Sequence, residues 1–288
     1  MNRDTVMAIL NTQIFEGDKR KIIEKLASSP ERYIGDFRPT KPRTKLVQNL
    51  LQSHEIRFGD AIEFLLRQIL VDQGFTNLDR KLTVNSDKVL SVDQYFKKKN
   101  AYFFIEQKIR DDHDSSKKKG QISNFAEKLD FLFKRHSTKI SGIMYFVDPS
   151  FSKNRNYYLK ELSILGKAYP IELRLLYGQD LFSFLHCPQV WLDLSSWVKN
   201  WKSSLDNFPS IDLDLSPEGS IEELKLISPN DWRKFLGNDA IWDDGIIRVI
   251  FSDGTTLRLL FGFFSQHQNS EYNKLAEALL VRINTFYS

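Results

Sequence analysis

The order of helical and strand-like segments between residues 46 and 185 constrains the fold of this chain most strongly. A long segment with apolar residues at helical spacing precedes three short runs rich in aromatic and β-branched residues, and helices and strands then alternate. One of the later strands is almost entirely apolar, as strands covered on both faces are. We therefore expect an α/β fold with a mixed β-sheet flanked by helices. The expected elements are helices at 46–73, 117–136, 156–169 and 178–185 and strands at 75–84, 88–96, 101–109, 139–148 and 171–178.

The two ends of the chain differ from this middle part. Before residue 46 come one or two amphipathic helices and then a basic, proline-containing loop. Near the C-terminus, 245–261 contains two alternating apolar runs around Asp253-Gly254, which predicts a β-hairpin, and a final helix follows. The expected division is N-terminal helices and basic loop at 1–45, a core at 46–200 and a C-terminal extension with helix, hairpin and helix at 201–288.

The composition is that of a globular protein with a packed core, because 41 % of the 288 residues are hydrophobic and 27 % are charged. The formal net charge of +4 is mildly basic, which is compatible with nucleic-acid binding but does not establish it. The single cysteine, Cys187, excludes an internal disulfide framework and fits a reducing cytosol. No apolar run is long enough for a membrane span and no signal peptide is evident, so we expect a cytoplasmic protein.

Two charged residues interrupt the third expected strand. Glu106 and Lys108 lie two positions apart, so their side chains point to the same face of that strand. The preceding strand carries Asp93, and a turn within 97–100 pairs Asp93 with Phe104. Asp93 then lies diagonal to Glu106, and the three charged groups converge on one patch of the sheet.

This combination of side chains suits a divalent cation. Two carboxylates a few ångströms apart repel each other, and burial raises the energy of both. A cation such as Mg²⁺ removes this repulsion by accepting oxygen ligands from both groups, and a neighbouring lysine can orient a water molecule. Metal and lysine together stabilise the charge that builds on a scissile phosphate. Asp93, Glu106 and Lys108 are therefore the candidate catalytic residues of a phosphodiester hydrolase.

These motifs resemble those of the PD-(D/E)xK nuclease superfamily. Asp93 and the tripeptide at 106–108 match its motif, although Val92 stands where the motif has proline. The family often places a metal-approaching glutamate on the preceding helix, where this chain has Glu63. The resemblance covers residues 46–185 and is greatest to type II restriction endonucleases. It implies a restriction-endonuclease-like αβββαβ core with extra C-terminal elements, and Mg²⁺ held by Asp93, Glu106 and Glu63.

Other interpretations of these charges are open. Glu106 and Lys108 could form an exposed salt bridge, although the apolar neighbours at 103–105 argue against a solvated face. The segment "RDDHD" at 110–114 could bind a cation, but its place after a strand and before a Ser-Ser-Lys loop favours a solvated turn. The five histidines show no zinc-site spacing, and Cys187 has no partner that indicates nucleophilic catalysis.

Contacts with DNA must come from outside the catalytic strands. Phosphate contacts set affinity and register, whereas base contacts set specificity. We expect phosphate contacts from the basic loop at 38–45 and from the lysines before Gln121, and base contacts from the loop at 148–158 or from the C-terminal region. The candidate DNA-binding residues are Arg43, Lys45, Lys117, Lys118, Lys119, Gln121, Asn154 and Arg155.

The expected function is that of a Mg²⁺-dependent, sequence-specific endonuclease acting on double-stranded DNA. Cutting both strands of a palindrome favours a homodimer, because a two-fold protein axis matches the two-fold axis of the DNA. The resemblance also implies a cognate DNA methyltransferase and a bacterial cytoplasm. A repair or junction-resolving nuclease of the same fold is the alternative enzyme. A DNA-binding module without catalysis is the alternative from another class.

Overall fold

The computed structural model describes residues 1–34, 37–205, 210–242 and 245–287, which divide into two compact units. The first unit contains residues 1–13 and 57–205, and the second contains 14–56 and 206–288. Each unit thus combines segments that are distant in the sequence, and the helices α1 (Arg3–Phe15) and α3 (Pro42–Asp72) contribute residues to both. A division into folding domains near residues 45 and 200 stays a prediction.

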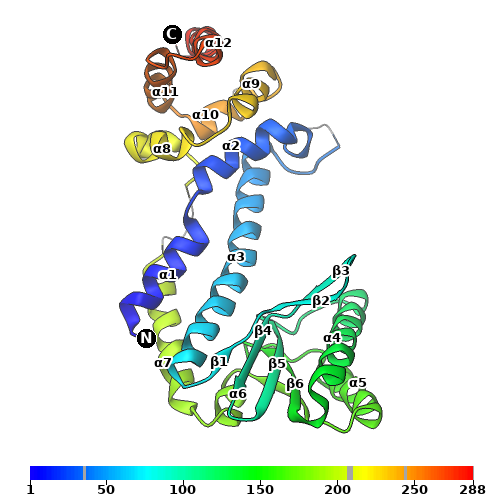
Figure 1. The fold of residues 1–288 in the computed structure, drawn as a ribbon. Helices are drawn as coiled ribbons and strands as arrows, with labels where there is room; N and C mark the ends of the chain where they lie inside the picture. Colours follow the sequence, from blue (N-terminus) through cyan, green and yellow to red (C-terminus); the bar gives the residue numbers. More distant parts are fainter. Residues whose placement is uncertain (35–36, 206–209, 243–244, 288) are drawn as a thin grey trace. The chain divides into compact units, whose positions relative to one another are not determined.

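The first unit contains a five-stranded sheet in the order β1-β4-β5-β6-β7, and Figure 1 labels the first four of these strands. The pairs β1–β4 and β4–β5 are antiparallel, whereas β5–β6 and β6–β7 are parallel. The sheet is therefore mixed and flanked by helices, as the sequence predicts. Its strands are β1 (Thr76–Asn77), β4 (Gln94–Lys98), β5 (Ala101–Lys108), β6 (Ile140–Phe146) and β7 (Leu173–Tyr177).

Two long helices cover the sheet face that carries Glu106. Helix α4 (Ser115–His136) contacts β6, and α5 (Arg155–Ala168) contacts β7. Their apolar residues share one core with Phe104 of β5 and Met144 of β6. The remaining helices of this unit are the 3-10 helix η2 (Ser137–Lys139), α6 (Gln179–Phe184) and α7 (Pro188–Ser203).

Side chains from neighbouring elements crowd one glycine in the centre of the sheet. Gly142 of β6 lies opposite Phe104 in the parallel register. A Cβ atom at Gly142 would stand 2.8 Å from Cε1 of Phe104, which is too close for any side chain. The absence of a side chain at Gly142 thus leaves room for the Phe104 ring on the face that carries Glu106.

Two expected strands are each divided in the structure. The segment 75–84 forms β1 and then β2 (Lys81–Asn85), and 88–96 forms β3 (Lys88–Ser91) and then β4. Strands β2 and β3 form a separate two-stranded ribbon. The second division falls at Val92-Asp93, so Asp93 lies between the ribbon and the main sheet.

The register between β4 and β5 differs by two residues from the expected one. The turn lies at Lys99-Asn100, and Lys99 adopts a positive φ of 53°. Gln94 consequently pairs with Ile105, which places Asp93 opposite Glu106 instead of Phe104. A shift of two residues leaves every side chain on the same face of the sheet. Asp93, Glu106 and Lys108 therefore still share one face, although the expected register was wrong.

The second unit is helical throughout its described residues. Its helices enclose a core of aliphatic and aromatic side chains that includes Trp232 and Phe235. The predicted hairpin at 245–261 is wrong. Besides the first part of α3, the elements are α2 (Asp18–Ser28), η1 (Pro30–Arg32), η3 (Leu213–Leu215), α8 (Pro217–Leu224), α9 (Pro229–Gly237), α10 (Ile247–Ile250), α11 (Thr255–Ser265) and α12 (Ser270–Phe286).

The turn signal within the mistaken hairpin was correct, but the turn joins two helices. Gly254 has a φ of 76° and precedes α11. The carboxylate of Asp214 accepts hydrogen bonds from the backbone N–H groups of Asp253, Gly254 and Thr256, at 3.0, 2.7 and 2.7 Å. These bonds satisfy N–H groups at the start of α11, a role that only long-range contacts reveal.

Helix α3 begins earlier than the sequence suggests. It starts at Pro42, a residue suited to a first helical turn, so Arg43 and Lys45 lie in this helix and not in a loop. Both belong to the second unit. Residues 35 and 36 of the expected basic loop lie outside the described residues.

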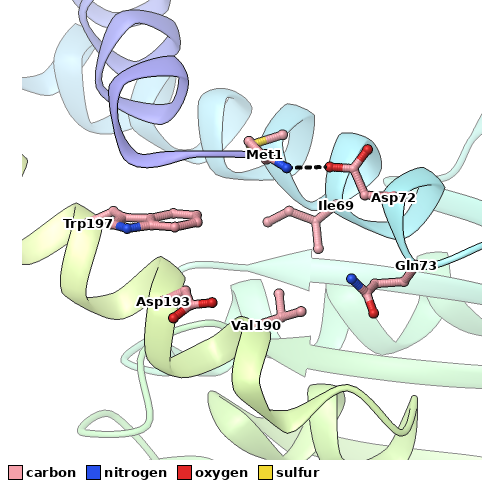
Figure 2. A pocket seen from close by; sticks show the side chains of 7 residues that line it. All are labelled: Met1, Ile69, Asp72, Gln73, Val190, Asp193 and Trp197. Atoms are coloured by element: carbon pink, nitrogen blue, oxygen red, sulfur yellow. Dashed lines mark hydrogen bonds and ion pairs between the residues drawn. The ribbon is translucent and has the colours of Figure 1, made fainter.

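A small hollow in the first unit is lined by Met1, by the end of α3 and by residues of α7 (Figure 2). The amino group of Met1 donates a hydrogen bond of 2.8 Å to Asp72 at its rim. None of the candidate catalytic residues lines it. Among the described residues, no helix is both long and apolar enough to cross a membrane.

Candidate active site

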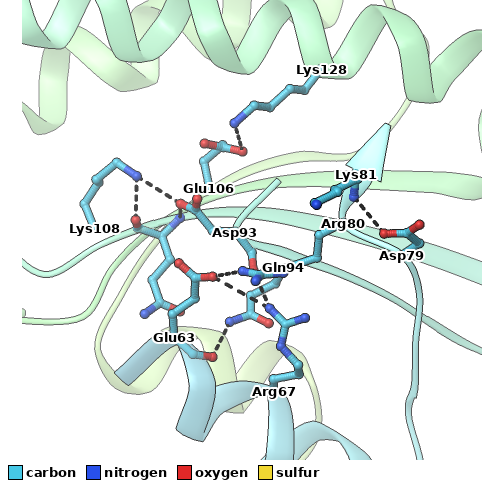
Figure 3. Close-up of polar contacts among 11 residues, drawn as sticks. Glu63, Arg67, Asp79, Arg80, Lys81, Asp93, Gln94, Glu106, Lys108 and Lys128 are labelled. Atoms are coloured by element: carbon cyan, nitrogen blue, oxygen red, sulfur yellow. Dashed lines mark hydrogen bonds and ion pairs between the residues drawn. The ribbon is translucent and has the colours of Figure 1, made fainter. Parts of the chain in front are cut away.

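Asp93, Glu106 and Lys108 converge as the sequence predicts (Figure 3). The Nζ atom of Lys108 lies 2.9 Å from Oδ2 of Asp93 and also donates to the backbone oxygen of Gln107 at 2.8 Å. The backbone N–H of Gln107 donates to the same Asp93 oxygen at 2.8 Å. The division at Val92-Asp93 thus positions the Asp93 carboxylate at the end of β5.

Glu106 forms a buried ion pair that sequence reasoning missed. Lys128 of α4 places its Nζ atom 2.7 Å from Oε1 of Glu106, and the two side chains are only 10 % and 9 % exposed. A signal was present in the sequence, since Lys128 lies at helical spacing from Phe125 and Leu132 on the apolar face of α4. A lysine on such a face indicates a buried acidic partner.

Burial and mutual repulsion shift the acid–base properties of these groups. Burial first, and then the negative charge of Asp93, raise the pKa of Glu106 to about 7, against the opposing effect of Lys128. Burial alone would lower the pKa of Lys108, but the neighbouring carboxylates, Asp93 first, outweigh it and raise that pKa. Lys108 is therefore cationic at neutral pH in the metal-free protein.

Glu63 lies on α3 beside this patch but is engaged by two arginines. Its carboxylate forms an ion pair with Arg80 and a longer one, 3.7 Å, with Arg67. Burial and then the charge of Asp93 raise the pKa of Glu63 to about 7. Arg67 contacts both the Glu63 carboxylate and the backbone oxygen of Asp93, so Glu63 lies beside Asp93.

The donor set fits a divalent cation held by two carboxylates. Among the described residues, no group of three or more acidic, histidine or cysteine side chains is arranged to hold a metal. Mg²⁺ needs no such cage, because it usually keeps several waters and takes one or two carboxylates together with substrate phosphates. Asp93 and Glu106 are the candidate pair, and a cation between them would offset their repulsion.

The segment at 110–114 is not the solvated turn that the sequence suggested, because Asp111 is fully buried. Its carboxylate accepts hydrogen bonds, each 2.9 Å long, from the backbone N–H of Asn154, the Asn154 side chain and the hydroxyl of Tyr177. These contacts tie the loop after β5 to the loop after β6 and to the end of β7. Asp114 is exposed and accepts from the N–H of Lys117 as the N-cap of α4.

Asn154 is a poor candidate for a base contact in this conformation. It is only 5 % exposed, and its amide donates to Asp111 and to the backbone oxygen of His113. Its Oδ1 atom accepts from Lys118 at 3.2 Å. A contact between Asn154 and DNA would require this network to open.

The other candidate DNA-binding residues of the first unit lie near the starts of α4 and α5. Lys118 also stacks over the Tyr157 ring, and Gln121 accepts a hydrogen bond from Tyr158. Arg155 is exposed and lies over the Tyr177 ring. Lys117 and Lys119, on either side of Lys118, lie in the first turns of α4 and are exposed, whereas Lys118 is partly buried.

The architecture and the family comparison agree on the class of protein. A mixed five-stranded sheet flanked by helices is compatible with a restriction-endonuclease-like fold. The family model described as type II restriction endonuclease, HinfI, matches residues 2–87 and 76–202, which is most of the chain. No individual curated protein matches. The chain belongs to the HinfI family of type II restriction endonucleases and is thus a site-specific deoxyribonuclease.

Proposed function

We propose that this endonuclease hydrolyses double-stranded DNA at a specific sequence with Mg²⁺ as its cofactor. One observation carries the proposal: Asp93, Glu106 and Lys108 meet at the end of β5 in a chain of a restriction endonuclease family. Two carboxylates close together remain costly even with ammonium partners, and a bound cation would offset their repulsion.

Each residue has a distinct part in this proposal. Asp93 and Glu106 would hold Mg²⁺, with Glu63 as a further candidate if its arginine partners move. Bound Mg²⁺ would lower the pKa of a water molecule and offset the charge developing on the scissile phosphate. Lys108, held by Asp93 and the Gln107 carbonyl, would orient the attacking water and stabilise the same charge.

Binding would depend on basic residues outside the catalytic strands. The phosphate-contacting candidates are Arg43, Lys45, Lys117, Lys118 and Lys119. Arg155 is a candidate for a base contact, as is Asn154 if its hydrogen-bond network opens, and Gln121 is a further DNA-binding candidate. Replacing the three lysines together should reduce the magnitude of the slope of log K against log salt by roughly 0.9 for each phosphate that is no longer neutralised. A homodimer and a cognate methyltransferase are part of the proposal, because both follow from cutting palindromic sites in a host genome.

Plasmid DNA incubated with Mg²⁺ tests the proposed reaction. The wild-type protein should give discrete fragments, whereas Asp93→Ala and Glu106→Ala should abolish cutting but retain DNA binding measured in Ca²⁺. Residual cutting above a few per cent of wild type in either variant would remove that residue from the metal site. Cutting of branched DNA alone would favour a junction-resolving nuclease, and binding without any cutting would favour a non-catalytic module.

A further inference from the structure

Two arginines converge beside the catalytic carboxylates. The Nη1 atom of Arg80 donates to Glu63 and lies 3.4 Å from the backbone oxygen of Asp93. The Nη2 atom of Arg67 lies 3.3 Å from the same backbone oxygen and 3.7 Å from Glu63. Both guanidinium groups therefore approach the residue that is central to the proposed metal site (Figure 3).

The two arginines have fewer negative partners than the two lysines of the site. Asp93 is paired with Lys108 and Glu106 with Lys128, so Glu63 is the one carboxylate left for both guanidinium groups within the described part of the chain. Both guanidinium groups approach Glu63 and the backbone oxygen of Asp93, so the two like charges lie close together and repel each other. This local excess of positive charge favours a further anion.

Arg80 is the member of the pair that an incoming ligand can reach. Its side chain is 37 % exposed, compared with 21 % for Arg67. Both contacts of Arg80 use its Nη1 atom. Its Nε and Nη2 atoms are not buried without a partner in the described structure, so they can serve a ligand. The backbone oxygen of Arg80 accepts from the N–H of Val92 at 3.1 Å, which fixes Arg80 at the base of the β2–β3 ribbon next to Asp93.

We propose that Arg80 binds a DNA backbone phosphate adjacent to the scissile one, and that Glu63 and the backbone oxygen of Asp93 hold its guanidinium in place. A guanidinium fork matches the geometry of phosphate oxygens and forms paired, charge-assisted hydrogen bonds. This inference rests on the proposed function, because the phosphate belongs to the DNA that the site would cut. It assigns Glu63 a positioning role toward Arg80.

The test compares Arg80→Gln with Lys81→Gln in binding to a random-sequence DNA duplex in Ca²⁺. Lys81 is the next residue, is exposed, and makes no side-chain ion pair in the described structure, so it controls for general positive charge. Arg80→Gln should weaken binding roughly tenfold at low salt and lower the magnitude of the salt slope by roughly 0.9. Lys81→Gln should leave both quantities near wild type.

An unchanged salt slope in Arg80→Gln, or an equal loss in both variants, would overturn the phosphate site. Reduced cutting in Mg²⁺ with normal binding would also overturn it, since Arg80 would then act only by positioning Asp93. Arg80→Lys guards against misfolding, because it keeps the charge and should retain the slope with weaker binding. If the wild-type protein binds DNA in an Arg80-dependent way but never cuts, the phosphate site stands and the proposed reaction fails.

Discussion

The two units differ in the polar side chains that they bury. Among the described residues, the first unit buries six polar or charged side chains, and the second unit buries two hydroxyl groups. The six include three ionisable groups, Glu106, Asp111 and Lys128. Buried charges are costly, whereas a hydroxyl that donates one hydrogen bond is not.

The buried hydroxyls of the second unit have a purely local explanation. Ser220 and Thr256 both donate to the backbone oxygen of Leu213, at 2.6 and 3.0 Å. They satisfy one carbonyl between helices and leave no charge to be compensated. The first unit instead maintains a buried carboxylate–ammonium pair at Glu106 and Lys128, beside the carboxylate of Asp93. Buried ionisable side chains, which are costly in free energy, therefore mark the candidate site as clearly as its sequence motif does.

Removing the buried cation should have the largest effect on stability. Lys128→Met leaves Glu106 buried without its partner, so the free energy of unfolding should fall by about 3–5 kcal/mol in alkaline buffer with EDTA. Urea unfolding measures this change. Lys134→Met is the matched control on the same helix, because Lys134 is exposed and its ion pair with Asp130 lies at the surface.

A double variant sharpens the interpretation of that result. Glu106→Gln combined with Lys128→Met removes both charges and should recover most of the stability, because no buried ion is left unpaired. Equal destabilisation by Lys128→Met and Lys134→Met would mean that burying the Glu106–Lys128 pair has no special cost in the free energy of unfolding.

The pH dependence of stability should also distinguish the units. The pKa of Glu106 is raised to about 7 in the folded state from 4.5, so the folded protein binds this proton more tightly than the unfolded chain. The associated stability is fully present below about pH 4.5 and is lost as pH rises through about 7, by about 3 kcal/mol in total. Urea unfolding of the metal-free protein should show this loss in wild type but not in Glu106→Gln.

The difference between these two proteins isolates Glu106 from other titrations. Asp114 and Asp130 have lowered pKa values and act in the opposite direction, since their stabilisation is lost as pH falls. They are present in both proteins and cancel. Parallel pH profiles for wild type and Glu106→Gln would show that the carboxyl group is not shifted by burial.

Lys108→Arg should slow cutting by about a hundredfold without unfolding the protein. Arginine keeps the positive charge but replaces a compact ammonium with a bulky planar fork, which should disturb the contacts to Asp93 and the Gln107 carbonyl. Single-turnover cleavage measures the effect. Gln107→Ala is the control, because Gln107 alternates to the opposite face of β5 and its buried Oε1 has no partner among the described residues. If Gln107→Ala were inactive and Lys108→Arg fully active, the catalytic side chains would lie on the opposite face of β5 from the one assigned here.

The charged patch was predictable from the sequence because it depends on local periodicity. The two-residue period of a strand places Glu106 and Lys108 on one face, and a two-residue error in register leaves Asp93 on that face too. Lys128 and the role of Asp111 were missed because their partners are distant in the sequence. The hairpin at 245–261 failed because a short apolar run around Asp253-Gly254 fits either two strands or two helices, and the Asp214 cap that decides the matter comes from far along the chain.

The smallest expected effect concerns the second unit and tests the other side of the contrast. Ser220→Ala should cost about 1 kcal/mol, because the Leu213 carbonyl still accepts from Thr256. Thr256→Val should behave alike, and the double variant should lose more than the sum, since it removes both side-chain donors from that carbonyl. Urea unfolding gives the three values, and cleavage rates should stay at the wild-type level in all three proteins. A loss of cutting in Ser220→Ala at unchanged stability would mean that the helical unit contributes directly to the active site. The contrast in buried polar groups would then not reflect a difference in function between the two units.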